Sequence, residues 1–188
     1  MNTNPYRLAG WSALASILIT IFAMITASIG LSVGWEKVGL PNDISVVAMF
    51  ALYIPILLGL DGMTRASSPA LSRILLLVGC LAAVIVVFVQ TIFIFRFVDF
   101  SFTAFPVSAS SVVIGLVCIA FNWLILRNRG FPTALTVIGI IAYAGMVVAS
   151  IGSLIEQGHP LTWIGGSLSI LSIVWLVWVG RLWLKKAA

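Results

Sequence analysis

Charged side chains are scarce in this chain. Its 188 residues include 10 Lys or Arg and 5 Asp or Glu, and 62% of the residues are hydrophobic. Soluble domains usually contain about 25% charged residues. The few charges present cannot cover a water-facing surface. This excludes a soluble domain, a disordered chain, a coiled coil and a secreted disulfide scaffold, and it indicates an integral membrane protein.

The sequence also has few residues suited to metal, redox or acid–base chemistry. The two cysteines, Cys80 and Cys118, lie far apart inside apolar runs, and the single histidine, His159, follows Glu156 and Gln157. This pattern lacks the Cys/His clusters of zinc, iron–sulfur and haem sites and the repeated acids that bind divalent cations. Glu156 and His159 are the remaining acid–base candidates, and we interpret their segment as an ordinary solvated loop. We therefore expect a non-catalytic protein with no metal and no cofactor.

Long uncharged stretches predict the fold. They cover residues 8–35, 44–60, 74–95, 100–126, 130–155 and 157–180. A membrane-spanning helix needs about 20 apolar residues, and barrel strands would alternate apolar with polar residues. The sequence therefore predicts an all-α, polytopic bundle of six transmembrane helices, forming a single domain over residues 1–188. We expect spans at about 8–34, 44–60, 74–95, 106–126, 132–155 and 161–181.

The distribution of basic residues predicts the orientation. Eight of the ten lie on one predicted side, and only Lys37 and Arg96 lie on the other. Because Lys and Arg are enriched in cytoplasmic loops, both termini are expected in the cytoplasm. The basic residues form no clustered face of a nucleic-acid-binding fold, so we expect no nucleic-acid partner. The tryptophans, Trp175, Trp178 and Trp183 among them, lie near predicted span ends and are interpreted as interfacial anchors.

Small residues four positions apart predict where helices approach each other. Such spacing lets backbones pack closely in lipid. The predicted helix-packing residues are Gly30, Gly34, Gly79, Ala83, Gly145, Ala149, Gly165 and Ser169. Residues 24–30 and 146–152 share five of seven residues, MITASIG and MVVASIG, which leaves a parallel internal repeat and a coincidence equally open.

Polar residues inside the spans are few. Gln90 and Asn122 are the deepest, and we expect each to form an interhelical hydrogen bond rather than one shared site. Asp61 and Arg65 are assigned to a polar loop, residues 61–73. Pro55 predicts a kink in the second span, because proline lacks the N–H of the helical hydrogen bond.

Phenylalanine is concentrated in one short segment. Six of the eleven phenylalanines lie within residues 93–105, around Arg96 and Asp99, which are spaced for an i,i+3 pair. We predict a partner-binding surface made of Phe97, Phe100, Phe102, Arg96 and Asp99. The alternative, that these rings are only the ends of two helices, stays open.

Three short segments carry a resemblance. They are RLAGW at 7–11, RNRG at 127–130 leading into FPTALTVIG, and WLVWVGRLWLKK at 175–186. They resemble segments of small bacterial six-helix membrane proteins of unknown function. The resemblance implies a multi-pass protein of the bacterial inner membrane, but it implies no activity and no catalytic residues.

Two functions are compatible with these features. The first is a non-catalytic accessory or scaffold subunit that binds membrane lipid and other membrane-protein subunits. The alternative is a carrier or binder of a small hydrophobic molecule such as a lipid, a quinone or a pigment. An internal cavity with polar groups would favour the alternative, and a membrane enzyme ranks third.

Overall fold

The computed structural model describes residues 4–156 and 158–188, and all regular structure in these residues is helical. Six segments are long and apolar enough to cross a membrane, as the sequence predicts. The last of them, Pro160–Ala187, contains two helices that meet at Ile170. The helices are α1 (Pro5–Val33), α2 (Gly39–Thr64), α3 (Pro69–Ile94), α4 (Phe100–Arg127), α5 (Thr133–Ile155), α6 (Pro160–Ser169) and α7 (Leu171–Ala187).

Several helices extend beyond the uncharged stretches that predict them. The helix α2 contains both Asp43 and Asp61, whereas the expected span covers only residues 44–60. The helix α4 begins at Phe100, six residues before the expected start, and Pro106 lies inside it. An uncharged run marks only the most apolar part of a helix, since backbone hydrogen bonding continues through polar turns. Pro55 lies inside α2, which is continuous through it.

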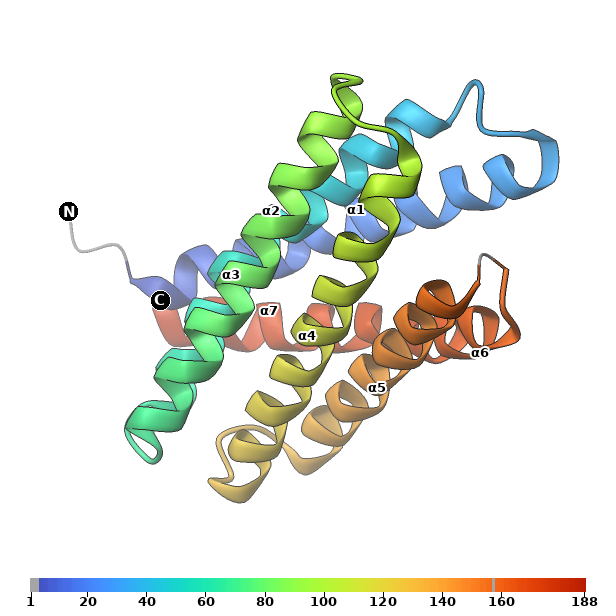
Figure 1. The fold of residues 1–188 in the computed structure, drawn as a ribbon. Helices are drawn as coiled ribbons and strands as arrows, with labels where there is room; N and C mark the ends of the chain where they lie inside the picture. The colour runs from blue at the N-terminus through green and yellow to red at the C-terminus, as the bar shows by residue number, and fades with distance from the viewer. Residues whose placement is uncertain (1–3, 157) are drawn as a thin grey trace.

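The helices form a ring in chain order. Consecutive helices from α1 to α5 pack side by side, α6 packs on α5, and α7 packs on α5 and closes the ring against α1 (Figure 1). The "terminal end" of the bundle holds both chain termini, the α2–α3 turn and the α4–α5 turn. The "distal end" holds the α1–α2, α3–α4 and α5–α6 turns.

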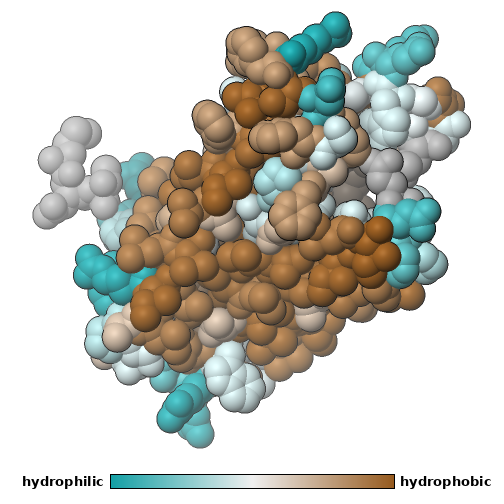
Figure 2. Space-filling view, in the orientation of Figure 1, coloured by the Kyte–Doolittle hydropathy of each residue, from teal (hydrophilic) through white to brown (hydrophobic). Residues whose placement is uncertain are grey.

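The outer surface is apolar between these two ends. Leu18, Leu77, Leu81 and Phe88 are more than 60% exposed, although they belong to helix interiors. Figure 2 shows the hydrophobic surface across the middle of the visible face, with hydrophilic residues gathered toward the ends. This distribution is that of a multi-pass membrane protein, in which lipid covers the exposed apolar side chains.

Aromatic rings fill the centre of the bundle. Tyr143 and Trp175 pack edge to face with ring centroids 5.3 Å apart, and Trp175 packs in the same way on Trp183 at 6.5 Å. The Trp175 indole N–H donates to Asn122 Oδ1 at 3.0 Å. Trp175 and Trp183 are fully buried, so the interpretation of these two residues as interfacial anchors is wrong. Both residues lie near the end of the sequence, where the membrane interface is expected, but they face the interior of the ring of helices.

A close helix–helix contact joins α5 and α6. A Cβ atom added to Gly165 would collide with the backbone of Gly145 and Ala149. Conversely, a Cβ atom added to Gly145 would lie 2.7 Å from both Gly165 O and Ser169 N. Two rows of small residues therefore let the backbones of α5 and α6 touch.

Other predicted packing residues have different neighbours. Gly79 lies against Leu57 of α2 and Val117 of α4, and Ala83 is fully buried one turn further along α3. Gly30 lies under the Trp35 ring, which follows it in the chain, rather than under a neighbouring helix. Gly34 ends α1 with φ of +101° and open space around it, so the turn, not packing, requires glycine there.

Two glycines that the sequence analysis did not identify lie where α7 packs on α1 and closes the ring of helices. A Cβ atom on Gly10 of α1 would lie 3.0 Å from Gly180 O of α7, and one on Gly180 would lie 3.1 Å from Gly10 O. The two glycines are far apart in sequence and neither belongs to a small-residue row, so spacing within one helix could not reveal them.

The α5–α6 contact can be tested with adjacent glycines. Gly165→Ala should destabilise the protein by about 1–3 kcal/mol, because the added methyl group meets backbone that cannot yield. Gly166→Ala is the matched control, since nothing lies within 4 Å of its added Cβ atom, and alanine favours the helix by up to about 1 kcal/mol. Thermal unfolding in mild detergent should show a lower Tm for the first variant only; equal Tm values would contradict the close contact.

Candidate functional site

A pocket opens among the helix ends of the distal end. Its volume is about 600 Å³, and its lining residues come from four helices, α2, α3, α4 and α5, and from the α1–α2 and α5–α6 turns. The lining residues are Trp35, Gly39, Asn42, Asp43, Gln90, Phe93, Phe100, Thr103, Ala104, Val107, Ser108, Ser153 and Gly158. Most of this surface is apolar, and the polar atoms are few, as in pockets that bind small molecules.

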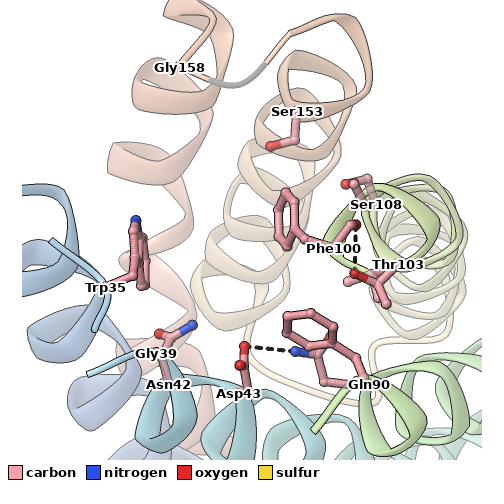
Figure 3. A pocket seen from close by; sticks show the side chains of 13 residues that line it. Trp35, Gly39, Asn42, Asp43, Gln90, Phe100, Thr103, Ser108, Ser153 and Gly158 are labelled. Carbon is pink, nitrogen blue, oxygen red and sulfur yellow. Dashed lines mark hydrogen bonds between the residues drawn. The ribbon is translucent and has the colours of Figure 1, made fainter. Parts of the chain in front are cut away.

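One carboxylate and one carboxamide form the polar base of the pocket. Gln90 Nε2 of α3 donates to Asp43 Oδ1 of α2 at 2.8 Å (Figure 3). Gln90 is 6% exposed, whereas Asp43 is half-buried. The hydrogen bond joins two helices and fixes both side chains. This is the interhelical role that the sequence predicts for Gln90, although its partner was not foreseen.

A second polar pair lies beside the first. Asn42 Oδ1 of α2 accepts a hydrogen bond of 3.1 Å from the Thr26 hydroxyl of α1. The Thr26 hydroxyl also lies 3.0 Å from the Ala23 carbonyl oxygen and 3.1 Å from the Phe22 carbonyl oxygen. The position of Asn42 is therefore set by α1, and the pocket side of α2 is held in place.

Aromatic rings form the apolar walls. Phe93 and Phe100 pack edge to face with centroids 6.1 Å apart. Figure 3 shows the rings of Trp35 and Phe100, together with Ser153, around the space next to the Asp43 carboxylate. Trp35 and Phe100 are 45% and 52% exposed. Both side chains thus keep exposed surface, although the Trp35 ring also covers Gly30.

One of the predicted partner-binding phenylalanines lines the pocket and the other two do not. Phe100 lines the pocket, while Phe97 and Phe102 are 77% and 57% exposed outside it. Phe95 and Phe105 are also exposed. The phenylalanine segment therefore divides into inward rings, Phe93 and Phe100, and four outward rings.

Arg96 and Asp99 do not form the expected ion pair. In residues 4–156 and 158–188 the single salt bridge joins Arg65 to Asp61. Arg96 has a φ of +61° and lies in the turn after α3, and Asp99 is the N-cap residue of α4. The i,i+3 spacing brings side chains together only on a continuous helix, which is interrupted here.

The terminal end contains a buried carboxylate that the sequence analysis assigned to a loop. Asp61 lies inside α2 and is 1% exposed. It accepts hydrogen bonds from Arg65 and, at 2.6 Å, from the Ser72 hydroxyl of α3. The Thr64 and Ser72 hydroxyls lie 2.8 Å apart. Each carboxylate oxygen thus has a donor, which indicates a structural link between α2 and α3.

The single histidine has a structural role at the start of a helix. His159 is the N-cap residue of α6, and its Nδ1 accepts from the Leu161 N–H at 3.3 Å. Cys80 and Cys118 are free thiols. No group of three or more His, Cys, Asp or Glu that could hold a metal occurs within the described residues.

Comparisons with protein-family models, with curated proteins and with solved structures each found no match. The distal pocket and the outward rings are therefore the features of the molecule that bear on its function. Sequence reasoning missed the pocket because Asp43 and Gln90 are 47 residues apart. The available signal was their depth: each lies about one turn from the distal end of its helix.

Proposed function

We propose that this chain is a non-catalytic membrane protein that binds a small amphiphilic molecule in the distal pocket. The observation that carries the proposal is the combination of a pocket of about 600 Å³, aromatic walls and one fixed carboxylate–carboxamide pair. An amphiphile presents an apolar body to the rings and a polar group to Asp43 and Gln90. A wholly apolar ligand would leave these two side chains without a further partner, which is costly in an apolar site.

The distribution of charge supports an orientation in which the pocket opens to the outside of the cell. The terminal end holds eight basic residues, and the distal end holds Lys37 and Arg96 with four acids. By the positive-inside rule the terminal end is cytoplasmic. In a bacterium the membrane would be the inner membrane, and the ligand would reach the pocket from the periplasmic side or from the outer leaflet.

This orientation can be tested by cysteine labelling. Asn128→Cys lies in the α4–α5 turn of the terminal end, and Asp99→Cys lies at the start of α4 at the distal end. An impermeant maleimide should label Asp99→Cys in intact cells and Asn128→Cys only after permeabilisation. The unchanged chain provides the background from Cys80 and Cys118. The reverse labelling pattern would contradict the orientation.

The binding function can be tested by filling the pocket. Ala104 of α4 lines it, so Ala104→Phe should displace the ligand. Ser101→Phe is the matched control, because Ser101 is exposed on the same helix and does not line the pocket. Native mass spectrometry of gently extracted protein should detect a bound amphiphile in the parent chain and in Ser101→Phe, and should detect little in Ala104→Phe. Equal occupancy in all three would refute the pocket as the ligand site.

A second candidate function is favoured by the outward rings. Phe95, Phe97, Phe102 and Phe105 are each more than 55% exposed at the distal end. A large apolar side chain left in water costs roughly 1.5–3 kcal/mol, so lipid or another chain must cover these rings. Coverage by a neighbouring membrane protein is the basis of the accessory or scaffold function, with membrane lipid as the other partner.

The accessory function has its own test, which leaves the pocket intact. Changing Phe97 and Phe102 together to Ser should abolish co-purification of a protein partner without lowering the Tm of the isolated chain, because neither ring lines the pocket or belongs to the core. Phe100 is kept, since it forms a pocket wall. Unchanged co-purification would exclude these rings as the partner surface.

A further inference from the structure

We infer that the distal pocket selects a ligand with a cationic head group, an amine or a quaternary ammonium attached to an apolar body. This inference rests on the proposed binding function and specifies the class of ligand. It is carried by three observations: the charge balance at Asp43, the aromatic rings around it, and the excess of acidic residues at the distal end.

The first observation is that the charge of Asp43 has no counterpart. Within residues 4–156 and 158–188, no Lys, Arg or His nitrogen lies within 4.0 Å of its carboxylate, because the single salt bridge is that of Asp61 and Arg65. Gln90 donates a hydrogen bond to one carboxylate oxygen but brings no charge. Burial of a charge in apolar surroundings is costly unless the charge is paired. A ligand cation would complete this pairing, whereas an anionic head group would be repelled.

Asp61 differs from Asp43 in how its charge is paired. Asp61 is more deeply buried than Asp43, yet its two oxygens receive hydrogen bonds from Arg65 and Ser72. The same chain thus contains one carboxylate whose charge is compensated within the protein and one whose charge has no counterion within the described residues.

The second observation is the set of rings. Trp35, Phe93 and Phe100 line the same pocket as Asp43, and Trp35 and Phe100 retain large exposed areas. The face of an aromatic ring attracts cations, most strongly for Trp, and rings grouped around a carboxylate are a common recognition site for ammonium groups. The same rings also contact the apolar body of the ligand.

The third observation is the charge of the distal end as a whole. Its acids are Glu36, Asp43, Asp99 and Glu156, against the basic residues Lys37 and Arg96. An excess of one sign around an opening raises the local concentration of ions of the opposite sign. The entrance therefore favours cations before any contact with Asp43 is made.

The test compares two probes of the same shape. Benzyltrimethylammonium carries a positive charge, and neopentylbenzene is its neutral isostere with carbon in place of nitrogen. Binding of each to the full chain in lipid nanodiscs is measured by isothermal titration calorimetry. We expect the cation to bind the parent chain about tenfold or more tightly than the isostere, which corresponds to about 1.4 kcal/mol.

Three variants locate the preference. Asp43→Asn keeps the size of the side chain and should reduce cation affinity about tenfold, leaving the isostere unchanged. Phe100→Leu should reduce cation affinity about two- to fivefold through loss of the ring face. Asp99→Asn is the matched control, because it removes an acid from the same end, does not line the pocket and keeps a residue suited to the N-cap of α4. It should weaken only the attraction at the entrance and keep most of the preference for the cation.

The outcomes separate the inference from the function on which it rests. A preference for the cation that Asp43→Asn removes and Asp99→Asn keeps supports the inference. Equal binding of both probes, or an Asp43→Asn variant that still prefers the cation, overturns the inference and leaves the pocket as a binding site. Absence of binding by both probes overturns the inference and counts against the proposed function itself. Unchanged Tm values of the variants show that each chain is folded.

Discussion

The backbone contact between α5 and α6 is the constraint on which the shape of the distal end depends. Gly165 allows α6 to lie directly on Gly145 and Ala149 of α5. The chain then turns at Ile170, and α7 packs on α1, where Gly10 and Gly180 face each other. The ring is thus closed by α7 toward the terminal end, while α6 is held on α5 at the distal end. The pocket lies at this end, bordered by Trp35 after α1 and Gly158 before α6.

The polar side chains at the two ends of the bundle differ in how completely they are paired. At the terminal end, Asp61, Arg65 and Ser72 satisfy one another and join α2 to α3. In the core, Asn122 is satisfied by Trp175. At the distal end, the Gln90–Asp43 bond also joins α2 to α3, but it leaves a charge without a counterion within the described residues. Because polar groups inside membrane proteins are costly unless paired, the unmatched charge of Asp43 supports the proposal of a binding site there, whereas the matched groups link helices.

The six spans could be predicted because they depend on composition alone. An apolar run of about 20 residues has one favourable structure in a bilayer, whatever its neighbours are. The position of a residue around the helix depends instead on which helices become neighbours. Trp175 and Trp183 illustrate this, because their place near the chain end suggested the membrane interface while the ring order buries them. The sequence places Asp61 in a loop for a similar reason, because a charge predicts the end of a span. Hydrogen bonds from Ser72 and Arg65 allow Asp61 to stay inside α2.

The phenylalanine segment contains rings that look alike in sequence but lie in two different environments in the structure. Its six rings look alike in sequence, but the turn at Arg96, with its positive φ, separates the end of α3 from the start of α4. Phe93 and Phe100 then meet across this turn and form one wall of the pocket, while Phe97 and Phe102 face outward. Phe100 and Phe102 share the first turn of α4, so any chain that covers Phe102 contacts the helix end that bears the pocket wall. The two proposed functions, binding of a partner and binding of a ligand, are therefore compatible, because both would involve the first turn of α4.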